Sequence, residues 1–196
     1  MAPLYAGSPL AAALYYLVIA AWLASEAFVF VRHVTVAGDR RQDRLSGPAL
    51  LGSLLVAVWL GTYMARAQPS AAITSARQLV FGLGLLLAVG GIATRWYAIT
   101  TLGRFFTMRV ITTADQTVVE TGPYKLVRHP SYTGALLTVL GVLLCSTNWV
   151  TLACFVLALP GFAYRIRVEE QALVGALGEP YAAYMRRTKR LVPYLI

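Results

Sequence analysis

Residues 132–164, YTGALLTVLGVLLCSTNWVTLACFVLALPGFAY, run for 33 residues without a charged side chain. The stretch is interrupted near its middle by the polar residues Ser146, Thr147 and Asn148. A membrane-spanning helix needs about 20 mainly apolar residues, so each half is short for a crossing. Because polar residues separate two apolar arms, we expect a tight hairpin of two short membrane helices, the first barely long enough to cross.

Three further apolar runs precede this hairpin. They cover residues 9–31, interrupted only by Glu26, then residues 48–65, and residues 79–94 with their flanks. The chain as a whole is 58% hydrophobic and only 13% charged, with a mean hydropathy of +0.65, whereas soluble domains carry about 25% charged residues. The sequence therefore predicts an all-α integral membrane protein with about five transmembrane helices. The first run lacks the basic start and the cleavage site of a signal peptide, so we expect it to be a membrane helix.

The basic residues are distributed unevenly between the connecting segments. Fifteen of the 17 lysines and arginines lie in residues 32–44, in residues 95–128 or from residue 165 onward. If five helices cross the membrane, these three segments lie on the same side of it. The remaining two, Arg66 and Arg77, lie on the opposite side. The positive-inside rule puts the basic side in the cytoplasm, with the N-terminus outside and the C-terminus inside. The net charge of +9 is then explained by topology and by anionic lipid head groups, and nucleic acid is not an expected partner.

Two features that suggest other chemistry have simpler explanations. Cys145 and Cys154 lie in the hairpin arms without a CxxC or Cys/His cluster, so we expect small buried core residues and no metal site. The GxG within residues 81–91 has Leu87 where a GxGxxG would need its third glycine. It also lies within an apolar run, so helix packing is the better interpretation than a nucleotide-binding loop.

Polar residues concentrate in two segments on the basic side, and the first covers residues 95–132. Gly122-Pro123 predicts a turn, and Pro130 suits the first position of a helix. Arg128 and His129 would then lie at a helix N-terminus, where free N–H groups and the helix dipole favour an anion. The alternative is that Arg128 extends to lipid phosphate and His129 caps the helix locally.

The second polar segment covers residues 164–193. The spacing of Ala172, Leu173, Ala176 and Leu177 predicts a helix lying on the membrane surface. Arg165 and Glu169 stand four residues apart on it, which is compatible with one helical salt bridge worth about 0.3–0.5 kcal/mol. Alternatively, the hairpin returns both residues to the neighbourhood of the Arg128-His129-Pro130 turn, where they would line a pocket with both signs of charge.

The sequences GPYKLVRHPSYTG (residues 122–134) and RVEEQALVGALGEPYAAY (residues 167–184) resemble the RHPxYxG…EE signature of the isoprenylcysteine carboxyl methyltransferase family and its phospholipid N-methyltransferase relatives. The resemblance covers approximately residues 102–193 and does not extend to the first two helices. It implies an integral-membrane enzyme that binds S-adenosylmethionine without a Rossmann domain, which agrees with the missing GxGxxG.

The resemblance also implies roles for individual residues. Arg165 falls at the position of the arginine that binds the substrate carboxylate in this family. Arg128 belongs to the motif, and we regard both arginines as candidate catalytic residues. Residues 116–119 resemble the family's His-Thr-Leu-Val segment, with glutamine in place of the histidine. The implied cofactor contacts are Gln116, Thr117, Val118, Val119, Tyr124, His129, Pro130, Ser131, Tyr132 and Glu169.

The chemistry of this cofactor fits that set of residues. S-adenosylmethionine carries a carboxylate, an ammonium group and a sulfonium; His129 and the N–H groups at the helix start can bind the carboxylate, and Glu169 the ammonium. Tyr124 and Tyr132 can stack on or hydrogen-bond to the adenosine, or simply pack. Glu170, about 100° further around the helix, should matter less if it faces solvent.

The acceptor is constrained less strongly. An ionised carboxylate needs only Arg165 to hold it, whereas an amine or thiol would need a base, and none is clear beyond His129. We therefore expect three membrane helices in residues 1–101 and a catalytic part in residues 102–196 that methylates a lipophilic acceptor from the bilayer, most like a prenylated cysteine carboxylate. A phospholipid amine or small lipophilic thiol is the alternative acceptor. A non-enzymatic scaffold or transporter subunit is the alternative class, although Glu26 is the sole acidic residue deep within a predicted span.

Overall fold

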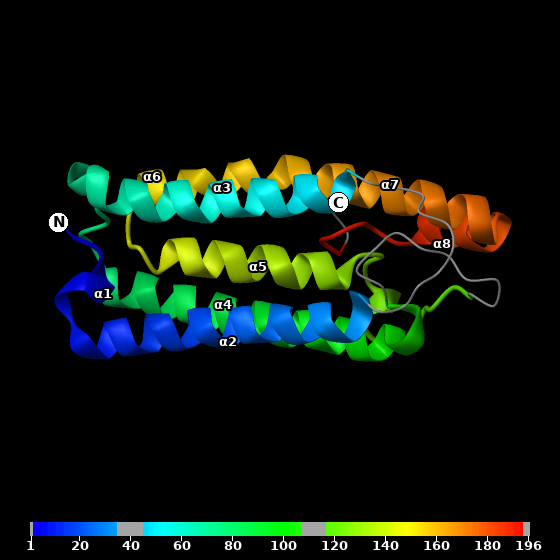
Figure 1. The fold of residues 1–196 in the computed structure, drawn as a ribbon, viewed down its shortest axis with the longest axis horizontal. Helices are drawn as coiled ribbons and strands as arrows, with labels where there is room; N and C mark the ends of the chain where they lie inside the picture. The colour runs from blue at the N-terminus through cyan, green and yellow to red at the C-terminus, as the bar shows by residue number, and fades with distance from the viewer. Residues whose placement is uncertain (1, 35–44, 107–116, 194–196) are drawn as a thin grey trace.

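A computed structural model describes residues 2–34, 45–106 and 117–193, and these residues fold as a helical bundle (Figure 1). The α-helices are α1 (Leu4–Gly7), α2 (Pro9–Val34), α3 (Ser46–Ala67), α4 (Arg77–Leu102), α5 (Pro130–Leu144), α6 (Trp149–Ala153), α7 (Leu159–Leu177) and α8 (Glu179–Arg187). Single 3-10 turns stand between them: η1 (Pro69–Ala71), η2 (Gly103–Phe105), η3 (Gly122–Lys125) and η4 (Cys154–Ala158).

Four segments are long and apolar enough to cross a membrane. They are Pro9–Arg32, Ser46–Ala67, Arg77–Phe105 and Trp149–Leu177, and the shorter apolar helix α5 lies among them. With the C-terminal helix α8, this confirms the predicted all-α membrane fold. Apolar side chains that face outward from the bundle, such as Leu10, Leu79 and Trp59, are those that a bilayer would cover.

The hairpin is present, but its second arm is longer than predicted. Asn148 caps α6, its side-chain oxygen accepting hydrogen bonds from the N–H groups of Val150 and Thr151, which confirms the turn. Beyond it α6, η4 and α7 run on as one apolar segment of 29 residues. The helix predicted through residues 172–177 is the C-terminal part of α7 and continues directly from the second arm, because Pro160 lies in the first turn of α7, where it interrupts no hydrogen bond.

Helix α4 also extends beyond its predicted end. The apolar run was expected to stop near Thr94, but α4 continues to Leu102 and ends at Gly103, whose φ of +56° suits glycine. Arg95 is therefore inside a helix rather than in a loop. It is buried, and its Nε lies 2.6 Å from the Glu26 carboxylate of α2. Pairing between helices lets both charges remain at this depth.

Helices α4 and α5 pack with their backbones in close approach. A Cβ placed on Gly141 would lie 2.4 Å from the Ala88 nitrogen, and one on Gly91 would lie 2.5 Å from the Thr138 nitrogen. Gly91 and likewise Gly84 therefore serve helix packing as predicted, whereas a Cβ on Gly82 or Gly90 would meet nothing within 4 Å. The two cysteines are also buried core residues as predicted, Cys145 with no exposed surface and Cys154 at 8%.

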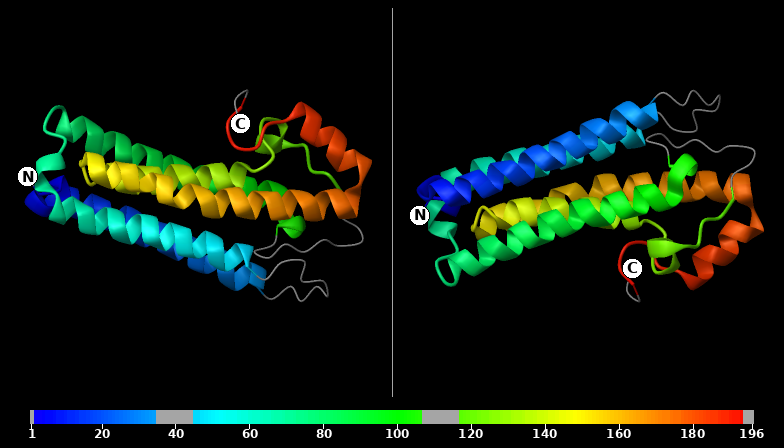
Figure 2. Two further views of the ribbon diagram at one scale, coloured as in Figure 1. Left: turned by 90° about the horizontal axis from the view of Figure 1, so that it is seen from above. Right: turned by 90° about the horizontal axis from the view of Figure 1, so that it is seen from below.

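The helices alternate in direction, so their connections gather at two ends (Figures 1 and 2). One end holds the N-terminus, the end of α3 with Arg66 and the start of α4 with Arg77. The other holds the end of α2, the start of α3, the turns η2 and η3, and α8. The basic side predicted from the sequence is therefore one end of the bundle, and the motif residues lie there.

Candidate functional site

The candidate site forms where α5 begins and α7 passes it. Gly122, with φ +54°, opens η3, and the chain then turns at His129 into α5 with Pro130 as its first residue. This confirms the predicted turn and helix start. Proline has no N–H to leave unpaired at this position and its ring fixes a helical φ, which places Tyr132 on the first turn.

The hydroxyl of Tyr132 links the two charged residues that the sequence singled out on α7. It donates a hydrogen bond to Oε2 of Glu169 at 2.6 Å and accepts one from Nε of Arg165 at 3.2 Å. The ring of Tyr132 stacks on His129, with centroids 5.6 Å apart, and meets Phe162 edge-on at 5.8 Å. A carboxylate, a guanidinium and two further rings therefore all contact the side chain of Tyr132.

Arg165 is 5% exposed and has a second partner from a different part of the chain. Its Nη1 donates to Oγ of Ser46 at 2.9 Å, and Ser46 has no exposed surface. Sequence reasoning missed Ser46, because the first two membrane helices carry none of the motif. The one available signal was its position immediately before an apolar run, which is typical of a residue at a helix start.

Glu170 does not face solvent, so the condition under which it should matter less than Glu169 is not met. Glu170 is 4% exposed, and its Oε1 lies 2.9 Å from Nε of Arg128 and 3.4 Å from Nε2 of His129. Its Oε2 accepts a 2.8 Å hydrogen bond from Arg190. The residues after α8 fold back over this face of α7, and helical periodicity alone does not reveal what covers a position.

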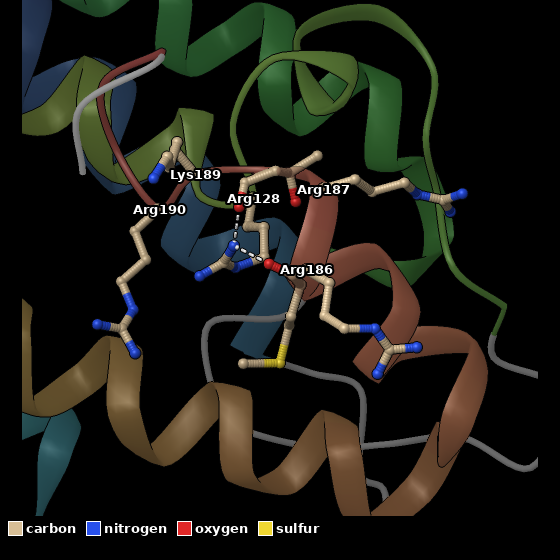
Figure 3. Close-up of a pocket in the computed structure, with 7 residues that line it drawn as sticks. Arg128, Arg186, Arg187, Lys189 and Arg190 are labelled. Atoms are coloured by element: carbon tan, nitrogen blue, oxygen red, sulfur yellow. Dashed lines mark hydrogen bonds between the residues drawn. The ribbon is translucent and has the colours of Figure 1, made fainter.

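The backbone N–H groups of Arg128 and His129, immediately before α5, have partners in the C-terminal part of the chain. The N–H of Arg128 donates to the Lys189 carbonyl at 2.7 Å, and the N–H of His129 donates to the Arg190 carbonyl at 3.0 Å. The guanidinium of Arg128 also donates to the carbonyl oxygens of Met185 and Thr188 (Figure 3). Both residues are thus bound to the C-terminal part of the same chain.

Two other predicted contacts have partners within the protein. The Tyr124 hydroxyl points to the Ala98 carbonyl at 3.4 Å, and burial raises its pKa. The Ser131 hydroxyl accepts a 2.9 Å hydrogen bond from Arg95. The Tyr184 hydroxyl donates to the Tyr124 carbonyl at 2.6 Å, and burial raises the pKa of Tyr184 to about 12, so the hydroxyl stays a donor.

The upstream segment is described only in part. Gln116 lies outside the described residues. Thr117 is exposed, and Val118 and Val119 are partly buried, in a stretch without regular structure that leads into η3. Immediately after it, Glu120 pairs with Arg187 of α8 at 2.6 Å, which joins this segment to the C-terminal residues.

A basic pocket lies between Arg128 and the residues at the end of α8 and after it (Figure 3). Its volume is about 310 Å³. The residues that line it are Arg128, Met185, Arg186, Arg187, Thr188, Lys189 and Arg190. Tyr132, Arg165 and Glu169 are not among these lining residues.

Known proteins share both the sequence and the fold of this part of the chain. The model of the isoprenylcysteine carboxyl methyltransferase (ICMT) family matches residues 83–175. The protein-S-isoprenylcysteine O-methyltransferase of Saccharomyces cerevisiae is 35% identical over 123 residues, which are 61% of this chain and 52% of that one. Protein-S-isoprenylcysteine O-methyltransferase B of Arabidopsis thaliana is 32% identical over 119 residues, 59% of this chain and 60% of that one.

A solved structure of a eukaryotic intramembrane Ras methyltransferase ICMT superposes with a TM-score of 0.56 at 23% identity, covering 82% of this chain and 55% of that one. This match extends the shared fold beyond the residues that the family model covers. The chain spans about half to three fifths of the length of these relatives. Residues 83–175, which include the RHPSYTG motif and both glutamates of α7, are thus similar in sequence to the isoprenylcysteine carboxyl methyltransferase family.

Proposed function

We propose that this protein is an integral-membrane, S-adenosylmethionine-dependent methyltransferase that acts on a lipophilic carboxylate, most like a prenylated cysteine. The observation that carries the proposal is the position of the Tyr132 hydroxyl between Glu169 and Arg165, at 2.6 and 3.2 Å. A carboxylate for the cofactor and a cation for the acceptor then lie on either side of one phenol, as a transfer between two bound molecules requires.

The side chains around Tyr132 suit this cofactor. S-adenosylmethionine supplies a methyl group made electrophilic by a sulfonium, together with an ammonium and an adenine. The carboxylate of Glu169 is partly buried and accepts a hydrogen bond from a neutral phenol, so it can bind an ammonium group. The rings of His129, Tyr132 and Phe162 offer flat surfaces beside it. We propose further contacts from residues 116–119, Tyr124, Pro130 and Ser131.

Arg165 is proposed to hold the acceptor. Its guanidinium is oriented by Tyr132 and Ser46, and a planar guanidinium suits the two oxygens of a carboxylate. An ionised carboxylate has no proton to lose before it accepts a methyl group, so the site needs position and the exclusion of water rather than a general base. Arg128 is proposed to act differently, by holding the motif against Glu170 and α8 without touching the acceptor.

The placement of the site suggests how substrates reach it. We propose that the basic end of the bundle faces the cytoplasm, with the N-terminus outside, so a soluble cofactor would approach Glu169 from that side. The lipophilic part of the acceptor would lie along the apolar helices and enter from the bilayer. Residues 102–196 would supply the groups for catalysis, with Ser46 as a support from residues 1–101.

Two measurements on the purified protein test this function. Calorimetric titration should detect binding of S-adenosylmethionine, and labelled methyl groups should then pass to a prenylated cysteine in preference to phospholipid amines and lipophilic thiols. Absence of cofactor binding would overturn the methyltransferase proposal. Transfer confined to amines or thiols would overturn the choice of a carboxylate.

A further inference from the structure

The residues after α8 are bound directly to the RHPSYTG motif. We refer to residues 188–191 as the C-terminal strap. Lys189 forms a parallel bridge with Val127, and the strap carbonyls accept the N–H groups of Arg128 and His129. The hydroxyl of Thr133, in the first turn of α5, donates to the Leu191 carbonyl at 2.7 Å. The strap thus contacts the motif on both sides of Pro130.

One strap side chain reaches the buried carboxylate of α7. Arg190 donates from Nη2 and from Nε to Oε2 of Glu170, at 2.8 and 3.0 Å. The side chain of Arg190 is 45% exposed, whereas that of Glu170 is 5% exposed. The hydrogen bond to Glu170 raises the pKa of Arg190, so this end of the pair remains cationic.

The other oxygen of Glu170 contacts the motif as well as Arg190. Oε1 accepts from Nε of Arg128 at 2.9 Å and from Nε of Arg190 at 3.2 Å, and it lies 3.4 Å from Nε2 of His129. A carboxylate can rotate about its last bond, and hydrogen bonds from Arg190 to both of its oxygens restrict that rotation. The orientation of Oε1 toward Arg128 and His129 therefore depends on a residue 20 positions further along the chain.

We propose that Arg190 is a positioning residue of the active site. It seats the C-terminal strap on residues 127–129 and, through Glu170, orients His129 against the ring of Tyr132. The match to the family model ends at residue 175, so Arg190 lies outside the part of the chain that this model covers. The catalytic consequence rests on the proposed function, whereas the seating of the strap does not.

The test compares Arg190→Gln with Arg186→Gln, a matched control. Arg186 lines the same basic pocket, but its side chain is 64% exposed and pairs with the exposed Glu179. Hydrogen–deuterium exchange should show that Arg190→Gln speeds exchange of the amides in residues 127–133 by about tenfold, the loss expected for hydrogen bonds to a charged group. Arg186→Gln should exchange like the parent, and the thermal midpoint of both variants should stay near that of the parent.

Cofactor titration of the same variants reports on the active site. Arg190→Gln should weaken S-adenosylmethionine binding by about tenfold, and Arg190→Lys should restore part of the loss because it keeps one charged hydrogen bond. In a Glu170→Gln background, Arg190→Gln should add less than about twofold, because the shared partner is already gone. Additive losses would overturn the proposed route through Glu170.

The two proposals fail in different ways. If the parent protein binds no S-adenosylmethionine, the proposed function is overturned. If Arg190→Gln nevertheless speeds amide exchange in residues 127–133, the seating of the strap by Arg190 remains supported. If Arg190→Gln and Arg186→Gln both exchange like the parent, the positioning role of Arg190 is refuted. If Arg190→Gln does not fold, Arg190→Lys decides between these outcomes by the same local exchange.

Discussion

The Tyr132 hydroxyl donates its hydrogen to Glu169 at 2.6 Å, and this bond joins helix α5 to helix α7 beside Arg165. The residues are 37 positions apart in the sequence, and the hairpin between them brings them together. Because the phenol has one hydrogen, its donation to Glu169 leaves its oxygen to accept from Arg165. The hydroxyl therefore fixes the orientation of both charged side chains.

Removal of this hydroxyl should affect binding without emptying the core. In Tyr132→Phe the ring still packs on His129 and Phe162, but Glu169 and Arg165 lose their common partner. We expect cofactor affinity and methyl transfer to fall by about tenfold each, which corresponds to one or two charge-assisted hydrogen bonds. Tyr164→Phe, on the same helix as Glu169 but 41% exposed, is the control and should behave like the parent in titration and turnover. Equal affinities for both variants would contradict this role for Tyr132.

The two adjacent glutamates should have different effects when neutralised. Glu169→Gln should weaken S-adenosylmethionine binding by at least tenfold with little change in the thermal midpoint, because its partner in the protein is a neutral phenol. Glu170→Gln should instead lose roughly 3 kcal/mol of stability, because the buried guanidinium of Arg128 loses its counter-ion. Thermal unfolding in detergent and calorimetric titration, run on both variants, distinguish these effects. A Glu170→Gln variant as stable as the parent would be evidence against the buried ion pair.

Substitution of Arg165 separates acceptor classes. Arg165→Lys keeps the charge but loses the planar group that Tyr132 and Ser46 orient. Transfer to a prenylated cysteine carboxylate should fall by about tenfold or more, while cofactor affinity should change little because Glu169 remains. An amine-bearing lipid should show no such loss. Turnover of the carboxylate lipid by Arg165→Lys at the parent rate would remove the reason to prefer a carboxylate.

Packing of α4 on α5 should tolerate no additional methyl group at the helix crossing. In Gly141→Ala the new Cβ would lie 2.4 Å from the Ala88 nitrogen, so the helices must separate, at a cost of about 1–3 kcal/mol. Gly82→Ala is the matched control, because a Cβ there meets nothing within 4 Å; it should be neutral or slightly stabilising. The thermal midpoints of the two variants in one detergent provide the comparison, and an equal shift in both would argue against the close approach.

The orientation in the membrane can be read with reporters at the two ends of the bundle. A reporter fused after Ile196 should be cytoplasmic, and one inserted at Ser70, in η1 between α3 and α4, should be external, because basic segments are retained on the cytoplasmic side. Inverted signals from both positions would reverse the side assigned to the active site.

The sequence by itself determined the membrane fold, the hairpin and the start of α5. These features depend on local physics: long apolar runs cannot remain in water, Asn148 satisfies the free N–H groups of α6, and Pro130 fits only the first turn of a helix. The motif residues were also recognisable, because their order along the chain resembles that of a known family.

Only the tertiary structure decided which partners those residues have. Helical periodicity placed Glu169 and Glu170 on different faces of α7, but it did not show that the C-terminal strap covers Glu170 and binds it through Arg190. It gave no sign that Ser46 would reach Arg165 across 119 positions. A helix pattern reports the direction of a side chain relative to its own axis, whereas burial and pairing depend on which distant segments pack against that side.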